Sequence, residues 1–213
     1  MSATALARRV ASVAVMIALL AAAMLVYSMH ERDYDKAYAP LMTYGSVGQD
    51  VNAGPFSIRV DKVTIAKSVT EAAYGNVVPP LRTAPNAIFV VVDGREMATK
   101  DGTKLSNVVL RGSDGTQYGL SGKGTSDKFT DSVAQPGYWI AGAWLFEVPR
   151  SAVAGLHLQV GNQTENDVPH ETFPHLGFEF NPGADVDLGI DGDKAASLIA
   201  NAPEKAGYRE PQE

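Results

Sequence analysis

The chain has 213 residues, of which 45% are apolar and 20% are charged, and its formal net charge is −6. This balance is typical of a globular protein and excludes a largely disordered chain. The acidic excess argues against nucleic acid as a main partner, because binding phosphates requires a basic face. The sequence contains no cysteine, which excludes a disulfide scaffold, a thiolate metal site and a cysteine nucleophile.

An apolar block near the N-terminus predicts a membrane anchor. Residues 10–29 are twenty positions without a charge, and a helix needs about 20 apolar residues to span a bilayer. Arg8 and Arg9 precede the block, so the positive-inside rule places residues 1–9 in the cytoplasm as a short arm and the remainder outside the cell membrane. Tyr27 falls near the outer end, where aromatic rings favour the membrane interface. We therefore predict a single-pass signal-anchor.

A cleaved signal peptide is the rival interpretation of this block. Signal peptides have a shorter apolar core, of about 7–15 residues, followed by small residues at the cleavage site. The alanines at 21–23 fit such a site, but apolar residues continue beyond them, which favours a retained anchor. The arginine pair also suggests a twin-arginine export signal, although the surrounding residues carry little else of that motif.

The residues after the anchor predict a stalk and then a β-domain. Residues 30–43 are irregular and begin with several charges, whereas residues 44–180 carry strand patterns. Apolar and polar residues alternate over 56–60, which is the period of a strand with one buried face. The alternation slips by one position at residues 61–62, and this slip predicts a β-bulge.

The middle of the β-domain contains a loop, a buried strand and a hairpin. Residues 74–86 hold one glycine and three prolines, a density of breakers that predicts a loop without regular structure. Residues 87–92 form a continuous apolar run, which is typical of a central strand buried on both faces. Asp114-Gly115 lies between two strand-like stretches and predicts a tight turn with positive φ.

The second half of the β-domain adds further short strands. Residues 138–148 are aromatic and end at Pro149, and residues 155–160 and 176–180 alternate between apolar and polar positions. The chain thus contains about seven to nine short strands separated by turn signals, and this pattern predicts a mainly β fold, an immunoglobulin-like β-sandwich.

The last residues predict an acidic C-terminal extension over 181–213. This stretch holds seven acids and three bases. Asp191 is placed to cap a short helix over 194–201 with Leu198 and Ile199 on its apolar side. Residues after Pro203 are expected to fray.

Several segments carry a resemblance to a known family. They are Gly45–Gly48, Gly54–Val60, Phe89–Val92, Leu110–Tyr118 and the Pro136-Gly137 turn that leads into Ala143–Pro149. Together they resemble the telokin-like, immunoglobulin-like extracellular domains of unknown function on Gram-positive, especially actinobacterial, membrane proteins. The resemblance covers residues 44–161 and implies a β-sandwich without catalytic residues. The chain departs from that family at Asp93-Gly94, where the family continues its strand, and residues 170–213 lie outside the match.

Two groups of residues are candidates for metal binding. His170-Glu171 and His175 approach a zinc-protease motif, but the spacing is one residue too long and Pro174 breaks the helix that the motif requires. Four aspartates, Asp185, Asp187, Asp191 and Asp193, lie near Gly192 and approach a calcium loop. Leu198 occupies the position of the acidic ligand at its end. We therefore expect a loop between strands and a solvated acidic face with a helix cap, and predict no metal ligands.

The aromatic residues offer a candidate contact surface. On a regular strand, Trp139 points away from Trp144 and Phe146, because their separations are odd. We predict that Trp144 and Phe146 lie in the core and that Tyr138 and Trp139 are the possible partner contact.

These observations lead to one functional expectation and one alternative, and a structural spacer that presents its C-terminal tail is a third hypothesis. We expect a membrane-anchored, extracytoplasmic, non-catalytic binding or accessory module of the bacterial cell envelope, with no cofactor and no catalytic residues. Its partners are the lipid bilayer, through residues 10–29, and another membrane or envelope protein. The alternative is a zinc- or calcium-dependent extracytoplasmic enzyme or sensor that uses His170, His175 and the aspartates.

Overall fold

The computed structural model describes residues 13–28, 41–71, 79–123, 133–163 and 182–208. The chain divides into two compact units, residues 1–39 with 177–180 and residues 40–176 with 181–213.

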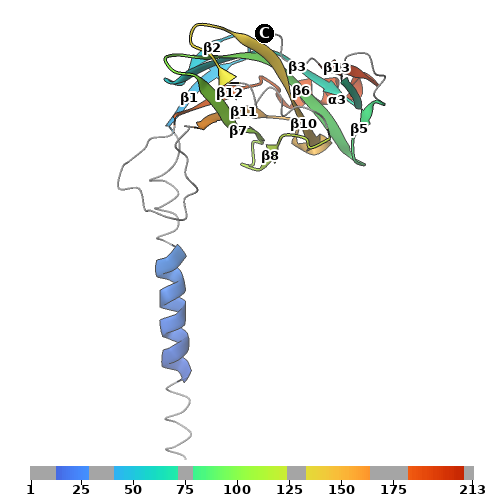
Figure 1. Ribbon diagram of the computed structural model, residues 1–213. Coiled ribbons are helices and arrows are strands. Elements are labelled where there is room, and N and C mark those ends of the chain that lie inside the picture. The colour runs from blue at the N-terminus through green and yellow to red at the C-terminus, as the bar shows by residue number, and fades with distance from the viewer. Residues whose placement is uncertain (1–12, 29–40, 72–78, 124–132, 164–181, 209–213) are drawn as a thin grey trace, which may run out of the picture. The chain divides into compact units, whose positions relative to one another are not determined.

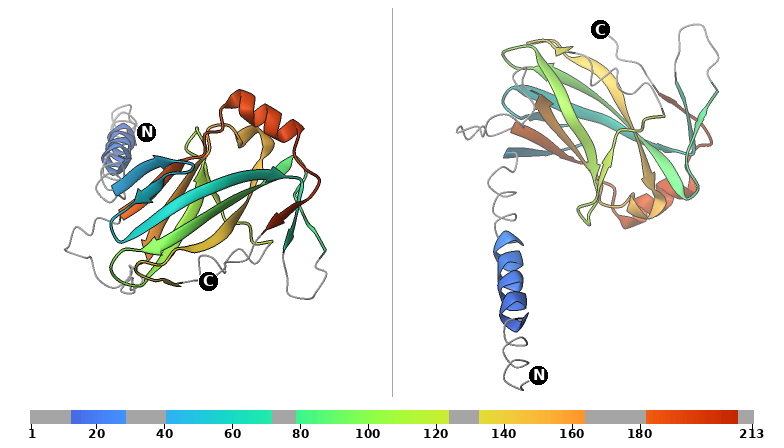
Figure 2. Two further views of the ribbon diagram at one scale, coloured as in Figure 1. Left: turned by 90° about the horizontal axis from the view of Figure 1, so that it is seen from above. Right: turned by 60° about the horizontal axis from the view of Figure 1, so that its bottom comes forward.

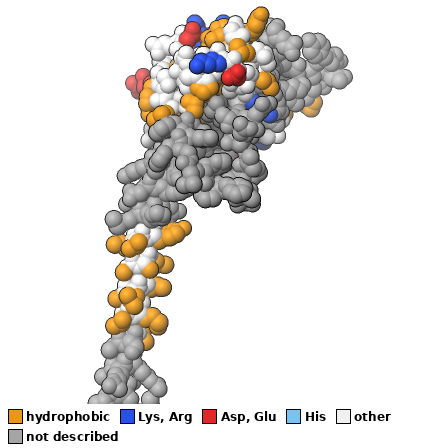
Figure 3. Space-filling view, turned by 60° about the vertical axis from the view of Figure 1, so that its left-hand side comes forward, with side chains coloured by type: hydrophobic (Ala, Val, Ile, Leu, Met, Phe, Trp, Pro, Cys, Tyr) orange, Lys and Arg blue, Asp and Glu red, His pale blue; other side chains and the backbone are white. Residues whose placement is uncertain are grey.

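A helix over residues 13–28 is the described part of the first unit. Every residue of this helix is exposed, and Figure 3 shows hydrophobic side chains along its length. No helix within the described ranges is long and apolar enough to cross a membrane. The predicted span over 10–29 is therefore not confirmed.

The second unit is a β-sandwich (Figure 1). The larger sheet has the order β1 (Leu41–Ser46), β12 (Pro182–Asp187), β11 (His157–Gln163), β7 (Thr103–Arg111) and β8 (Gln117–Gly119), and β9 (Val133–Ala134) also pairs with β7. The second sheet has the order β10 (Ile140–Pro149), β6 (Ala87–Ala98), β3 (Phe56–Ala66) and β2 (Asp50–Asn52). A small third sheet has the order β13 (Ala206–Tyr208), β4 (Ser68–Glu71) and β5 (Leu81–Arg82). These pairings confirm the predicted mainly β sandwich.

Two short helical elements complete this unit. They are the 3-10 turn η1 (Arg150–Ala152) and the helix α3 (Gly192–Ala200), and Figure 2 shows α3 outside the stacked sheets. The side chain of Asp191 accepts a hydrogen bond from the Lys194 N–H at 2.8 Å and so caps α3. Leu198 and Ile199 pack against the core, as the sequence predicted.

Strand β6 is buried on both faces, as its continuous apolar run predicted. Ile88, Val90 and Val92 point into the main core between the two large sheets. Phe89 and Val91 point the other way, into a second cluster that also contains Val69 of β4 and Ala206 of β13. The small third sheet therefore contributes the side chains that cover the outer face of β6.

The predicted bulge and the predicted hairpin are both present. The pairing of β3 with β6 shifts between Val60 and Lys62, so that Val63 and Ile65 return to the core side. Strands β7 and β8 pair in an antiparallel arrangement around Gly115, whose φ is +84°. Glycine accepts this backbone conformation without steric cost.

Two expectations about irregular segments are wrong. The stalk does not extend to residue 43, because β1 begins at Leu41 and pairs in parallel with β12. The loop over 74–86 contains the two-residue strand β5, in which Leu81 pairs with Val69 and packs against the second cluster. Residues 72–78 of that loop, and the strand expected over 176–180, lie outside the described residues.

The C-terminal residues are not a separate extension. Strand β12 lies between β1 and β11 in the larger sheet, so the sandwich continues past residue 180. After α3 the chain pairs again, because β13 runs parallel to β4. Lys67 also lies 2.6 Å from the Glu204 carboxylate. The expected fraying after Pro203 is therefore wrong as far as Tyr208.

Gly94 of β6 tests how closely Trp144 packs against the sheet. A Cβ at Gly94 would lie 2.7 Å from the Arg59 carbonyl oxygen and 2.8 Å from Cζ3 of Trp144. We expect Gly94→Ala to lower the free energy of unfolding by about 1–3 kcal/mol, because both the Arg59 backbone and the buried ring have to move. Gly119→Ala in β8 is the matched control, since a Cβ there meets nothing within 4 Å. Equal losses in the two variants, measured by denaturant unfolding, contradict the packing argument.

Candidate functional site

The Tyr138-Trp139 pair lies on a tight turn before β10. The Tyr138 N–H donates to the Gln135 carbonyl at 3.3 Å, and Gly137 has a φ of +77°. Ala98 at the end of β6 holds this turn, because it forms a bridge with Pro136 and accepts the Gly137 N–H at 3.4 Å. Tyr138 is 74% exposed and Trp139 is 36% exposed. The two rings are therefore available on the surface, and their contact with a partner remains a prediction.

Trp144 and Phe146 are fully buried, which confirms their predicted place in the core. Trp139 precedes the first residue of β10, so its exposure results from the turn and not from strand alternation. Trp139 is thus exposed, as expected, but strand alternation is not the cause of its exposure.

A second group of polar side chains surrounds Asp185 on the larger sheet. Asp185 of β12 is 1% exposed, and its Oδ1 lies 2.7 Å from Nδ1 of His157. Its Oδ2 accepts a hydrogen bond from Nε2 of Gln159 at 2.7 Å and lies 3.8 Å from Nη2 of Arg111. These residues come from three neighbouring strands, β7, β11 and β12. Asp185 thus joins the strands, because a buried carboxylate is stable only with such partners.

The chemistry available to this group is limited. His157 is 32% exposed in its side chain, and its contact with Asp185 engages Nδ1 and leaves Nε2 for a proton or a ligand. One imidazole is too few for a metal centre. Among the described residues, no group of three or more histidine, aspartate or glutamate side chains is placed to hold a metal ion.

The remaining metal candidates have other roles or lie elsewhere. Asp191 caps α3, and Asp187 accepts a hydrogen bond from the Gly189 N–H at 2.8 Å. The two histidines of the alternative hypothesis, His170 and His175, lie outside the described residues. Arg8 and Arg9 do so as well.

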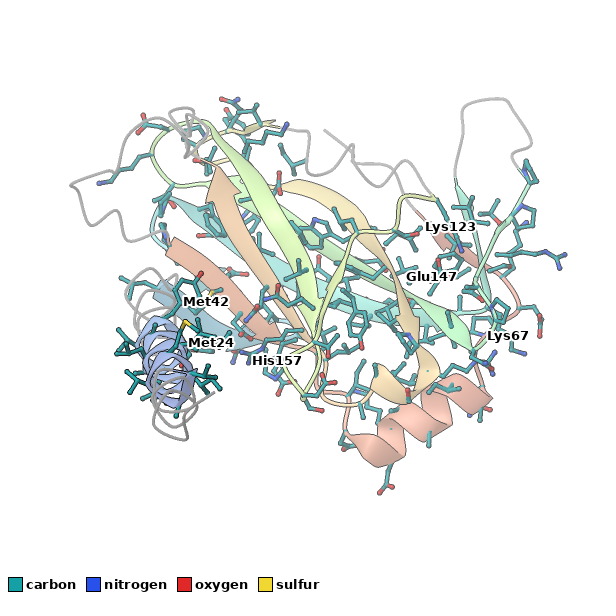
Figure 4. The ribbon with its side chains drawn as sticks, turned by 90° about the horizontal axis from the view of Figure 1, so that it is seen from below. Met24, Met42, Lys67, Lys123, Glu147 and His157 are labelled. Carbon is teal, nitrogen blue, oxygen red and sulfur yellow. The ribbon has the colours of Figure 1, made fainter. Side chains whose placement is uncertain are left out.

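A charged pair joins the segment after β8 to β10. Nζ of Lys123 lies 2.7 Å from Oε2 of Glu147 and 5.9 Å from the centre of the Phe89 ring, and Figure 4 shows the pair side by side. Burial tends to raise the pKa of Glu147, but hydrogen bonds from Lys123 and from the Ala84 N–H outweigh it and hold the pKa below its usual value. The pair therefore ties the residues beside β5 to the outer face of the second sheet.

Glu96 of β6 is the most unusual titratable group in the sandwich. Its side chain is fully buried, and neither carboxyl oxygen has a hydrogen-bond partner among the described residues. Its cross-strand neighbours are Ile58 and Ile140. Desolvation raises the pKa of Glu96 to about 8, so the carboxyl is protonated at neutral pH.

Sequence reasoning missed both Glu96 and the group around Asp185. Glu96 has the same parity as Val90 and Val92, so extending the strand through Asp93-Gly94 places it on the core side. Asp185 alternates with the inward-facing Val186, but no local pattern indicates that His157 lies beside it, since the two are 28 positions apart in the sequence.

Comparisons with known proteins add little to this picture. No protein-family model matches the chain, and no curated protein matches it significantly. Similar solved structures include an uncharacterised β-sandwich protein from Clostridium difficile (7% identity, 70% of this chain and 95% of that chain, TM-score 0.41). Others are a conserved hypothetical protein from Bacillus anthracis (16%, 57% and 91%, 0.41) and a "putative lipoprotein" from Bacillus subtilis (13%, 68% and 39%, 0.40). The sandwich assignment therefore rests on the strand pairing.

The raised pKa of Glu96 predicts that the free energy of unfolding falls as the pH rises. Its pKa is about 8 in the folded protein and near 4.5 when unfolded, so the folded state holds its proton more tightly. Stability linked to Glu96 is fully present below pH 4.5 and is lost as pH rises toward 8. Between pH 5 and pH 8 we expect a loss of about 3 kcal/mol, which Glu96→Gln removes because the amide does not titrate. Urea unfolding at both pH values measures this loss of stability. Parallel pH profiles for the wild type and Glu96→Gln refute the prediction.

Proposed function

We propose that this protein is a single-pass membrane protein of the bacterial envelope whose extracytoplasmic β-sandwich acts by binding and not by catalysis. The observation that carries the anchor is the helix over 13–28. Its large apolar side chains are 49–68% exposed, and those of Leu20, Leu25 and Val26 are each 64% exposed. A helix that is apolar on all sides belongs in a protein core or in a bilayer, and it lies within the uncharged residues 10–29.

The proposed orientation follows from charge. Arg8 and Arg9 precede the apolar block and favour a cytoplasmic N-terminus. The sandwich then lies outside, where a chain without cysteine depends on its core alone. Such a core is present: the main cluster contains 25 of the described residues, among them Trp144, Phe146 and Phe56.

We also propose that the sandwich is immunoglobulin-like. Strands β6 and β7 follow one another in the chain but belong to opposite sheets. The chain then returns so that β10 pairs with β6 and β11 with β7, and β12 pairs next to β11. This crossing order is that of an immunoglobulin sandwich. It supports the resemblance to telokin-like domains. A relationship to the actinobacterial membrane proteins that carry such domains is part of the same proposal.

The proposed partner is a component of the membrane or envelope, another membrane protein among them. Tyr138 and Trp139 are the proposed contact residues, because exposed aromatic side chains are over-represented at binding surfaces. Contact with a partner is the function that we assign to these two residues.

The absence of native cysteine makes the topology directly measurable. Single-cysteine variants Ser2→Cys and Thr116→Cys place one thiol before the anchor and one on the exposed β7–β8 turn. We expect a membrane-impermeant maleimide to label Thr116→Cys in intact cells and Ser2→Cys only after the membrane is broken. Labelling of Ser2→Cys in intact cells, or recovery of the protein in the fraction released by alkaline washing, contradicts the proposed anchor.

Photo-crosslinking in cells tests the contact. A photoreactive phenylalanine analogue in place of Tyr138 is expected to give a discrete adduct, because the side chain is 74% exposed. The same analogue at Thr116, which is also exposed, is the control and is expected to give none. Mass spectrometry of the adduct identifies protein or lipid, and equal yields at the two positions refute Tyr138 as a contact.

A further inference from the structure

Four of the five large exposed apolar side chains of the sandwich lie at one end. Among the described residues of this unit they are Leu41, Tyr44, Val133, Tyr138 and Trp139. Leu41 opens β1, Val133 opens β9, and the two aromatic residues of the turn precede β10. The described turns at the other ends of these strands, between β1 and β2, between β7 and β8 and after β12, hold no residue of this set. Tyr44 is the exception in this set, because it lies inside β1 opposite Asp185.

Strand register shows that Leu41 and Val133 lie at the same end of the larger sheet. Leu41 pairs with Pro182 at the start of β12, whose next residue pairs with Gly161 of β11. The end of β11 pairs with the start of β7, where Lys104 pairs with Val133. Leu41 and Val133 thus lie four strand spacings apart, about 19 Å. We call this end of the sandwich the tether end, because the chain enters the sandwich there. It carries Leu41, Val133, Tyr138 and Trp139.

The tether end is covalently close to the proposed anchor. The eleven residues 30–40 join the apolar block to Leu41 and span at most about 40 Å when fully extended. Any membrane that holds residues 10–29 is therefore within reach of this end.

The chemistry of the tether end fits a membrane surface. Tyrosine and tryptophan rings favour the interface of a bilayer, where one side of the ring is apolar and the other is wet. The β6–β7 turn beside them carries Lys100 and Asp101, and Lys104 follows. The opposite end carries the acids Asp114, Asp187, Asp191 and Asp193 and the bases Arg111, Arg150 and Lys194, so anionic headgroups favour the more basic tether end.

We infer that the tether end rests against the headgroup layer of the bilayer and that Tyr138 and Trp139 contact lipid. This inference rests on the proposed anchor and names the component of the membrane that the turn meets. A protein partner is then left with the sheet faces and the acidic opposite end.

Tryptophan fluorescence of the full chain tests the inference, because the sequence has only two tryptophans and Trp144 is fully buried. The chain is reconstituted in vesicles of phosphatidylcholine and phosphatidylglycerol, with brominated acyl chains as the quencher. We expect bromolipid to quench wild-type emission and Trp139→Phe to abolish the quenchable part while the Trp144 emission is retained. Thr116→Trp in the Trp139→Phe background is the control at the opposite end and is expected to stay unquenched.

The outcomes separate this inference from the anchor. If the vesicles retain the protein after alkaline washing but bromolipid leaves Trp139 unquenched and aqueous acrylamide quenches it, the inference is overturned and the anchor stands. If the vesicles do not retain the protein, the anchor fails and the inference fails with it. Quenching of Trp139 and Thr116→Trp to the same extent also overturns the inference, because it shows no preferred end.

Discussion

The burial of β6 on both faces is the constraint on which the rest of the sandwich depends. One face of the strand requires the larger sheet, and the other requires a cover for Phe89 and Val91. The small third sheet provides that cover through Val69, Leu81 and Ala206. Burial of apolar surface stabilises the folded state by about 25 cal/mol per Å². Strand β6 gains this stabilisation on both of its faces. The short strands β5 and β13 exist at the outer face because this burial holds them there.

The same alternation that buries β6 also buries Glu96. Its parity is that of Val90 and Val92, so the strand cannot turn the carboxyl outward without exposing its apolar run. The register puts Ile58 and Ile140 on either side, and neither offers a hydrogen bond. The protein therefore keeps a neutral acid in its core and loses stability as that acid ionises. Glu96 also lies beside the start of β10, because its cross-strand neighbour Ile140 directly follows Trp139.

Features with a local cause were predictable from the sequence. The bulge at Asp61-Lys62, the Asp114-Gly115 turn and the Asp191 cap each depend on neighbouring residues, and the structure contains all three. Strands β5 and β13 were missed because their stability comes from β4 and the second cluster, which lie far away in the sequence. Propensity says little about a two-residue strand, since tertiary contacts decide whether it forms.

The candidate surface depends on long-range pairing in the same way. Leu41 and Val133 are 92 positions apart in the sequence. Only the succession of β1, β12, β11, β7 and β9 brings them to the same end of the larger sheet. Spacing along the chain indicated Tyr138 and Trp139 but not the residues beside them. Once the register is known, the polarity of the sandwich follows: apolar side chains gather where the chain enters, and aspartates gather at the other end. This polarity bears on function only together with the proposed anchor.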